Sequence, residues 1–207
     1  MHVPDSRIDA VVFDLGGVLI DWNPRYLYRT LFDDEEEMEA FLRDVCTPEW
    51  IDVTDAGVSF ADAVRELAER HPEHRERIEA YRARWSETLG DAIDGTVGVL
   101  KELRASGVRL YALSNWSTET FPIAEQRFPF LGVFDGILLS GEARASKPSP
   151  QIFEAFLDRF DLSAARCVFI DDNERNLSAA AGLGFDAIRF RSPEQVRVEL
   201  ARRRLLA

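Results

Sequence analysis

The sequence predicts an α/β protein with a doubly wound parallel sheet and an all-helical domain inserted after the first strand. Short, almost wholly apolar strands alternate with amphipathic helices through the C-terminal half, which is typical of parallel strands buried on both faces. The first predicted strand ends at Phe13 and the next begins at Val108. A crossover between parallel strands needs about a dozen residues, so this longer gap, with its helical spacing of apolar residues, indicates an insertion.

The first strand is predicted over Ile8–Phe13 and ends at Asp14. The helices predicted in the insertion are Arg25–Phe32, Glu35–Val45, Phe60–Arg70 and Glu73–Leu89. Asn23 with Pro24 suits the start of the first of these helices, and Ser59 suits the N-cap of the third. The predicted domains are therefore a core of residues 1–20 and 91–207 and a helical domain of residues 21–90.

The C-terminal half supplies the remaining strands and helices in alternation. The predicted strands are Val108–Leu113, Gly136–Leu139, Cys167–Ile170 and Ala187–Phe190. The predicted helices are Val97–Ala105, Glu119–Arg127, Pro150–Phe160, Arg175–Gly182 and Pro193–Leu206. Ser192 suits the N-cap of the last helix.

The chain is acidic, because 25 Lys and Arg residues stand against 37 Asp and Glu residues, a net charge of −12. This charge disfavours nucleic acid and anionic lipid as partners, and no apolar run is long enough to span a bilayer. The N-terminal residues show no targeting pattern. We therefore expect a cytoplasmic protein, monomer or homodimer, that acts on a small molecule. Cys167 lies in an apolar strand and is expected to be a buried thiol.

Polar or flexible residues follow predicted strands at four places. These are Asp14-Leu15-Gly16-Gly17, Ser114-Asn115, Ser146-Lys147-Pro148 and Asp171-Asp172-Asn173. Taken singly, each group has an ordinary alternative as a turn or, for the last group, as the N-cap of the next helix. Because ligands of open α/β sheets bind at the carboxyl ends of the strands, we expect the four groups to meet in one site.

Three of these residues, Asp14, Asp171 and Asp172, are carboxylates that would repel each other at one edge of the sheet. A divalent cation relieves that repulsion, and oxygen ligands with few other donors suit Mg²⁺. Gly16 and Gly17 allow the backbone after Asp14 to curl and present N–H groups to an anion.

The remaining groups suit a phosphate. Ser114 offers a hydroxyl group and Lys147 a compact cation. Asn176 lies four residues after Asp172, one helical turn on, and is expected to face the same site. A carboxylate nucleophile with Mg²⁺, a hydroxyl group and a lysine is the composition of a phosphoryl-transfer centre.

In this order the four groups resemble the four motifs of the haloacid dehalogenase superfamily. The matching segments are Val11-Val12-Phe13-Asp14-Leu15-Gly16-Gly17-Val18-Leu19, Leu113-Ser114-Asn115, Ser146-Lys147-Pro148 and Phe169-Ile170-Asp171-Asp172-Asn173. The helical insertion after the first motif is similar to the cap of subfamily I of that superfamily. The sequence most resembles bacterial sugar-phosphate phosphatases close to the glucose-1-phosphate phosphatase group, and the resemblance implies a Rossmann-like core.

The resemblance also implies the roles of the site residues. Asp14 would be the nucleophile that forms an aspartyl-phosphate, with Lys147 as the second catalytic residue. Mg²⁺ would be held by Asp14, the carbonyl of Gly16 and Asp172, with Asp171 near a metal-bound water. The phosphoryl group would be held by Ser114, Asn115, Lys147 and the backbone of Leu15 and Gly16.

One position departs from the pattern of the family. Its phosphatases usually carry a second Asp two residues after the nucleophile as general acid and base, and here that position is Gly16. Glycine offers a carbonyl to a metal but carries no proton, and general acid–base help is typically worth roughly 10²–10⁴-fold. Three explanations stay open: a good leaving group such as an anomeric sugar phosphate, a substitute residue or water, or slow turnover.

Two other functions fit part of the pattern. A 2-haloacid dehalogenase would use Asp14 without a metal, but it would have no cation to neutralise Asp171 and Asp172. A non-catalytic phosphate-binding regulatory protein is the other alternative, and Asp14 together with Lys147 and the Asp pair argues against it. A receiver domain of a two-component system fits less well, since its acidic pair follows the first strand.

The substrate is expected to contact residues outside the four motifs. Trp22, Arg25 and Trp116 are candidates, together with Asn176. For the aromatic residues, Trp50 included, packing within the helical domain is the ordinary alternative, and for Arg25 it is a solvated side chain.

Overall fold

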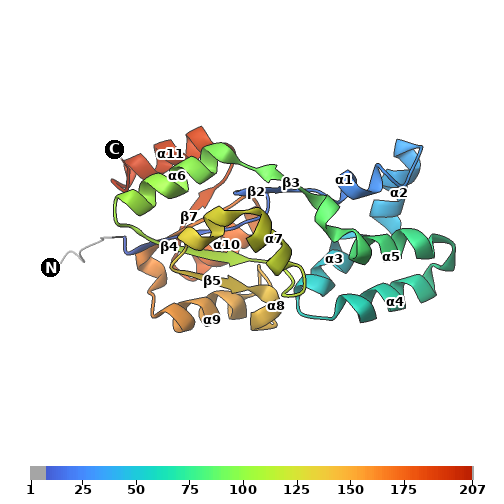
Figure 1. Ribbon diagram of the computed structural model, residues 1–207. Helices are drawn as coiled ribbons and strands as arrows, with labels where there is room; N and C mark the ends of the chain where they lie inside the picture. Colours follow the sequence, from blue (N-terminus) through green and yellow to red (C-terminus); the bar gives the residue numbers. More distant parts are fainter. Residues whose placement is uncertain (1–7, 207) are drawn as a thin grey trace.

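The computed structural model describes residues 8–206 and confirms the predicted α/β fold. Five parallel strands form the main sheet in the order β5-β4-β1-β6-β7 (Figure 1). Their bounds are β1 (Ala10–Phe13), β4 (Arg109–Ser114), β5 (Gly136–Leu139), β6 (Cys167–Asp171) and β7 (Asp186–Arg189). The N-terminal segment, residues 1–7, for which no targeting pattern is predicted, lies outside the described residues.

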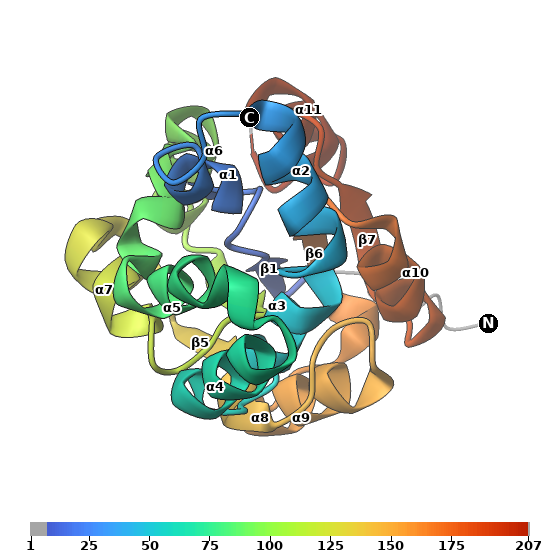
Figure 2. The same cartoon turned by 90° about the vertical axis from the view of Figure 1, so that its right-hand side faces the viewer.

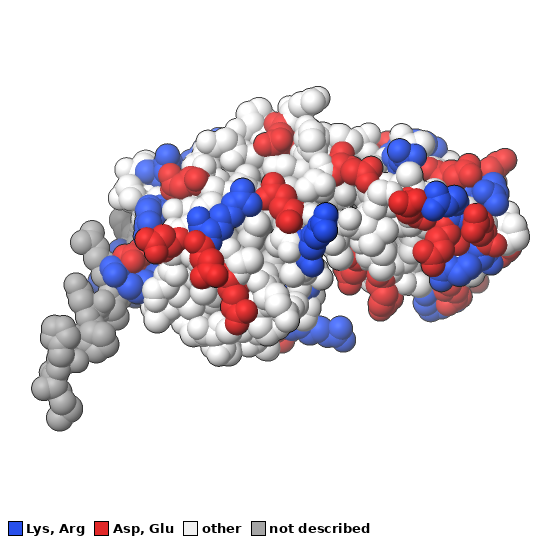
Figure 3. All heavy atoms as spheres, turned by 90° about the horizontal axis from the view of Figure 1, so that it is seen from below, with Lys and Arg blue, Asp and Glu red and all other residues white. Residues whose placement is uncertain are grey.

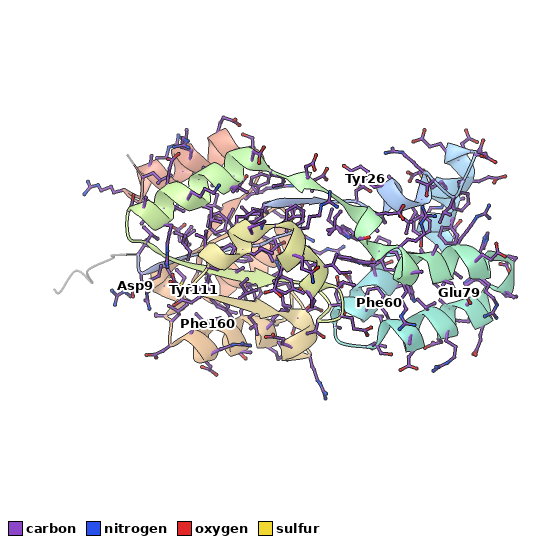
Figure 4. All side chains as sticks on the ribbon, viewed as in Figure 1. Asp9, Tyr26, Phe60, Glu79, Tyr111 and Phe160 are labelled. Atoms are coloured by element: carbon purple, nitrogen blue, oxygen red, sulfur yellow. The ribbon has the colours of Figure 1, made fainter. Side chains whose placement is uncertain are left out.

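The central strands are buried on both faces, as their apolar sequences predict. Every residue of β1 and β6 is buried, and Val12 of β1 lies between Tyr111 of β4 and Phe169 of β6. Helices α6 (Asp94–Ala105) and α11 (Pro193–Arg202) cover one face, and α9 (Pro150–Phe160) and α10 (Glu174–Gly182) cover the other. The rings of Tyr111 and Phe160, which are 4.8 Å apart between their centroids, illustrate the second layer (Figure 4).

The insertion forms a separate group of helices beyond the sheet (Figure 1). These helices are α1 (Pro24–Tyr28), α2 (Glu35–Asp44), α3 (Pro48–Asp55), α4 (Phe60–Arg70) and α5 (Arg75–Ala83). The expected caps are confirmed, since the side chains of Asn23 and Ser59 accept hydrogen bonds from backbone N–H groups of α1 and α4. Buried aromatic rings around Tyr81, which stacks on Phe60 and meets Trp50 edge-on, fill the interior of this helical group.

Two predictions about the insertion were wrong, and one of its helices was not predicted. The predicted helix Glu73–Leu89 is shortened to α5, flanked by short 3₁₀ turns at Pro72–His74 and Trp85–Thr88. The chain then becomes strand β3 (Leu89–Ala92), which pairs antiparallel with β2 (Ile20–Trp22), so the insertion is not wholly helical at its ends. Gly90 suits this pairing, because a Cβ atom there would lie 2.6 Å from the Asp21 carboxylate, which would then have to move.

The helix that was not predicted is α3, which the apolar spacing did not reveal. Thr47 caps this helix through a hydrogen bond from Trp50 N–H, and Pro48 occupies its first turn. At the other end of the chain, the helix predicted to reach Leu206 ends at Arg202, and Arg204 takes a left-handed backbone conformation.

The inserted helices lie over the carboxyl ends of the strands (Figure 2). The chain passes between the two parts through β2 and β3, and α3 contacts α8 (Ser140–Ala143), which follows β5. The backbone N–H of Phe60 also donates to the Glu119 carboxylate, which precedes α7 (Phe121–Arg127). These contacts hold the two parts together on the side opposite the β2–β3 pair.

Charges of both signs are interspersed on the face seen in Figure 3, so that face shows no patch of one sign. Ion pairs at the surface, such as that between Arg104 and Asp135, also bring charges of opposite sign together. Among the described residues, no helix combines the length and the apolar composition needed to cross a membrane.

Candidate active site

A cavity of about 760 Å³ lies between the sheet and the inserted helices. Residues from all four predicted groups line it, because the carboxyl ends of β1, β4, β5 and β6 lie at the same edge. They are Asp14, Gly16, Gly17, Ser114, Asn115, Lys147, Asp172 and Asn173. Asp171 is fully buried beneath the cavity floor. The structure therefore brings together segments that are far apart in the sequence.

The Asp14 carboxylate is held from three directions. Its Oδ1 accepts hydrogen bonds from the backbone N–H of Leu15 at 2.7 Å and from the Ser114 hydroxyl at 2.9 Å, and the Lys147 ammonium lies 2.9 Å from the same oxygen. Burial raises the pKa of Asp14 to about 7, although the attraction of Lys147 opposes this rise. Within the described residues, Oδ2 accepts no comparable hydrogen bond and is free for chemistry.

Lys147 joins two carboxylates. Its ammonium lies 2.7 Å from Asp171 Oδ2 as well as 2.9 Å from Asp14, and its side chain is almost fully buried. Burial alone lowers the pKa of Lys147, but the two carboxylates outweigh burial and raise it above the ordinary value. The lysine is therefore a permanent cation at the centre of the site.

Asn115 holds the backbone of this lysine. Its amide oxygen accepts from Lys147 N–H at 2.8 Å, and its amide nitrogen donates to the Lys147 carbonyl at 2.9 Å. This reciprocal pair fixes the loop that carries Lys147 to the end of β4. Asn115 was predicted to bind the phosphate, and in the structure its side chain is placed to orient Lys147.

Asp171 accepts hydrogen bonds on both carboxylate oxygens. Lys147 and the backbone N–H of Asn173 each contact one oxygen, and the Asn176 amide lies 3.1 Å from both. Asn173 also caps α10 through its side chain. The same residue therefore begins the helix and contacts Asp171 in the site. The predicted position of Asn176, one turn into α10 and facing the site, agrees with this geometry.

The donor set of this site fits a divalent cation. Asp14, Asp171 and Asp172 each place one carboxylate oxygen within 4.8 Å of the others. Burial and the neighbouring Asp171 raise the pKa of Asp172, as expected for carboxylates that crowd together without a counter-ion. Hard oxygen ligands of this kind are the ones that Mg²⁺ prefers.

Gly16 and Gly17 differ in whether their positions can accept a residue with a side chain. Gly17 has φ +73°, and a Cβ there would lie 2.6 Å from the Asp172 carboxylate, so only glycine fits. Its N–H donates to the Ile20 carbonyl and is not available to an anion. A Cβ at Gly16 would meet no atom within 4 Å, and the backbone there is not left-handed.

The predicted substrate residues also line the cavity. Trp22, Arg25 and Trp116 face it, and Arg25 forms a bidentate ion pair with Glu39 of α2, which orients its guanidinium. The indole N–H of Trp116 is buried without a hydrogen-bond partner among the described residues. Trp50, by contrast, packs inside the helical group.

The sequence model of the haloacid dehalogenase-like hydrolases matches residues 8–184 of this chain. The chain belongs to this family. The sesquiterpene phosphatase astK of Aspergillus oryzae is 26% identical over 179 residues, which cover 86% of this chain and 88% of that protein. The haloacetate dehalogenase H-2 of a Moraxella species is 34% identical over 88 residues, covering 42% of this chain and 39% of that enzyme.

The fold is shared with solved structures of the family. A magnesium complex of the enzyme bt-2542 from Bacteroides thetaiotaomicron superposes with a TM-score of 0.71 at 22% identity, covering 89% of this chain and 94% of that one. This likeness concerns the fold alone. The chain matches this family and is similar to several phosphatases. Together these findings support a haloacid dehalogenase-like hydrolase that acts on phosphoric monoesters.

One carboxyl group that lines the cavity of this hydrolase was not predicted from the sequence. Asp55 ends α3 and lines the cavity on the side opposite the sheet, one turn after Asp52. Burial raises the pKa of Asp55 to about 7, and the charge of Asp52 adds to the rise. The signal that could have revealed it is the Thr47-Pro48 pair, the same type of helix start as Asn23-Pro24.

The raised pKa of Asp55 predicts a pH-dependent stability of this hydrolase. The pKa of Asp55 is about 7 in the folded state and 3.8 ordinarily. Between these two pH values the folded state binds more protons than the unfolded state, so the stability falls as the pH rises from about 4 to 7. Asp55→Asn removes this loss, so we expect its Tm to exceed that of the wild type by roughly 5 °C at pH 8 and by less at pH 5.

The measurement is thermal unfolding at the two pH values in metal-free buffer. Glu69→Gln, which neutralises an exposed carboxylate of α4, is the control and should change Tm by the same small amount at both pH values. A pH-independent gain in Asp55→Asn would contradict the raised pKa.

Proposed function

We propose that this hydrolase is a Mg²⁺-dependent phosphatase that cleaves a small phosphorylated metabolite through an aspartyl-phosphate on Asp14. The observation that carries the proposal is the arrangement around Asp14. One oxygen of this carboxylate is fixed by Leu15 N–H, Ser114 and Lys147, and the other is free beside a cluster of two further carboxylates.

Each residue has a task in this reaction. The free oxygen of Asp14 attacks phosphorus, while Lys147 and the backbone N–H of Gly16 bind the phosphoryl oxygens. The Leu15 N–H and the Ser114 hydroxyl, which the resemblance assigns to the phosphoryl group, donate to Asp14 Oδ1 in this structure and would have to turn to the phosphoryl group when it binds. Asn115 contributes by orienting Lys147. The lysine charge opposes the negative charge that gathers on the phosphoryl group.

The metal ion would be held by Asp14, the Gly16 carbonyl and Asp172. Asp171 would stand beside it, because its oxygens already accept from Lys147, Asn173 and Asn176. When bound, Mg²⁺ neutralises phosphoryl charge and helps to align the reacting groups.

The substrate class proposed here is a small phosphorylated metabolite, with sugar phosphates as the first group to test. A cavity of about 760 Å³ is large enough for a molecule of that size. Trp22, Trp116 and the Arg25–Glu39 pair provide apolar faces and polar groups that suit a ring with hydroxyl groups.

The test of the proposed function is turnover of p-nitrophenyl phosphate with Mg²⁺ and after chelation. We expect activity with the ion and its loss in excess EDTA, since Asp14, Asp171 and Asp172 then lack the cation that draws the phosphate among them. Added Mg²⁺ should restore activity, and added Na⁺ at the same ionic strength should not. Undiminished turnover in EDTA would contradict the metal role.

The dehalogenase alternative is tested in the same samples. The similarity to the haloacetate dehalogenase H-2 favours this alternative, and the cluster of Asp171 and Asp172 opposes it. Halide release from 2-chloropropionate in EDTA would establish dehalogenation. Binding of inorganic phosphate without turnover of any phosphate ester would instead establish the non-catalytic function.

A further inference from the structure

The space above Gly16 is empty. A Cβ at this position would have no neighbour within 4 Å, yet the residue lies two positions after Asp14 and lines the cavity. No side chain of the loop itself can therefore give a proton to an atom bound at Asp14. A proton donor for the reaction must come from another wall of the cavity.

Asp55 occupies such a wall. It lies at the C-terminal end of α3, which the chain reaches through the insertion, and it lines the same cavity as Asp14, Ser114 and Lys147. Asp55 is close enough to Asp14 for their charges to repel each other. In an in-line displacement the leaving oxygen lies on the side of phosphorus opposite Asp14, which is the side of the inserted helices that carry Asp55.

Contacts from the core fix Asp55 in this place. The Ser140 hydroxyl of α8 donates to the Asp55 carbonyl at 2.5 Å, and the backbone N–H of Ser117, after β4, lies near the Asp55 carboxylate and lowers its pKa. Gly57 approaches the Gly141 carbonyl so closely that a Cβ there would lie 3.1 Å from it. The C-terminal end of α3, which carries Asp55, is thus held against the core.

We propose that Asp55 is the general acid and base of this hydrolase and takes the role that Gly16 cannot perform. This inference rests on the proposed phosphatase function. In the first step, Asp14 Oδ2 forms a bond to phosphorus, the bond from phosphorus to the leaving oxygen breaks, and the Asp55 carboxyl proton moves to that oxygen. The products are an aspartyl-phosphate, an alcohol and the Asp55 carboxylate.

The second step returns both residues to their starting states. The Asp55 carboxylate takes a proton from water as the water oxygen forms a bond to phosphorus. The bond between phosphorus and Asp14 breaks, which releases inorganic phosphate and restores the Asp14 carboxylate. Protons and charge balance over the two steps without any further reactant.

The electrostatic surroundings of Asp55 suit this double role. Burial raises its pKa to about 7, so both protonation states are populated near neutral pH. Asp52 on the same helix and Asp14 across the cavity raise the pKa further, and the Ser117 N–H lowers it. Tyr81 of α5 also faces Asp55 and has a pKa well above its ordinary value, so it stays neutral. Glu142 of α8 pairs with Arg159 instead.

The experiment compares Asp55→Asn with the wild type on p-nitrophenyl phosphate and glycerol 2-phosphate in saturating Mg²⁺. p-Nitrophenolate leaves without a proton, so its first-turnover burst should persist, while steady-state kcat falls because the second step lacks its base. Turnover of glycerol 2-phosphate should fall by roughly 10²-fold or more, since its leaving oxygen is strongly basic. Equal losses in the burst and in glycerol 2-phosphate turnover would overturn the assignment, as would no change.

Gly16→Asp provides the rescue. The open space at Gly16 accepts the new side chain, so Asp55→Asn with Gly16→Asp should hydrolyse glycerol 2-phosphate at least ~10-fold faster than Asp55→Asn alone. A double variant no faster than the single variant would contradict the view that both positions serve the same oxygen. Glu69→Gln, on the outside of α4, is the control for loss of an inserted-helix carboxylate.

The pH profile gives a further readout. Asp52→Asn removes a charge that raises the pKa of Asp55, so the basic limb of kcat for glycerol 2-phosphate should move to lower pH. An unmoved limb would overturn the assignment. Absence of burst and turnover in the wild type would be a different result, because it would reject the phosphatase function itself.

Discussion

Replacement of Asp14 by asparagine is expected to abolish phosphatase turnover, with a loss of at least ~10³-fold in kcat, because the amide cannot form an aspartyl-phosphate. The fold should remain intact. The amide oxygen can still accept from Leu15 N–H, Ser114 and Lys147, which are the contacts of Asp14 Oδ1. The measurement is kcat for p-nitrophenyl phosphate with circular dichroism of the same sample.

Asp158→Asn serves as the matched control for this substitution. Asp158 lies on the exposed side of α9, away from the cavity, and its replacement should leave kcat unchanged. Turnover of Asp14→Asn within a few-fold of the wild type would rule out Asp14 as the nucleophile.

Lys147→Met is expected to have the second-largest effect and to affect both activity and stability. The substitution leaves the carboxylates of Asp14 and Asp171 facing each other without the ammonium that contacts both. Removing one member of a buried charge network typically costs about 3–5 kcal/mol, and kcat should fall by roughly 10²–10³-fold, because an electrostatic contact to the phosphoryl group is lost.

The measurements are urea unfolding in EDTA and kcat in Mg²⁺. Lys101→Met is a suitable control, since Lys101 is an exposed residue of α6. We expect added Mg²⁺ to recover part of the lost stability of Lys147→Met, because the ion replaces some of the missing positive charge. A variant as stable and as active as Lys101→Met would show that the central lysine is dispensable.

The core of the fold could be predicted because its signals are local. Strands such as β1 and β6 are apolar on both faces, so their pattern does not depend on the insertion. The meeting of Asp14, Lys147 and Asp171 also followed from one general rule, that the carboxyl ends of parallel strands share an edge. No rule of this kind relates an inserted helix to that edge.

The inserted part was predicted less well for the same reason. Helix α3 is short, and its start depends on Thr47 and Pro48 rather than on a long apolar stripe. Strand β3 depends on pairing with β2, a contact between residues distant in the sequence. Asp55 was missed because its burial and its neighbour Ser117 come from tertiary packing that sequence spacing does not encode.

The single two-stranded connection between the sheet and the inserted helices has a consequence for the timing of the reaction. Both passages of the chain between the two parts run through β2 and β3, and the opposite side is closed by few polar contacts, such as Ser140 with Asp55 and Glu119 with Phe60. A rotation of the inserted helices about β2 and β3 would break these contacts and separate Asp55 from Asp14. In the phosphatase that we propose, Asp55 would therefore be in place only while the inserted helices cover the cavity, and an open enzyme would lack the group that activates water.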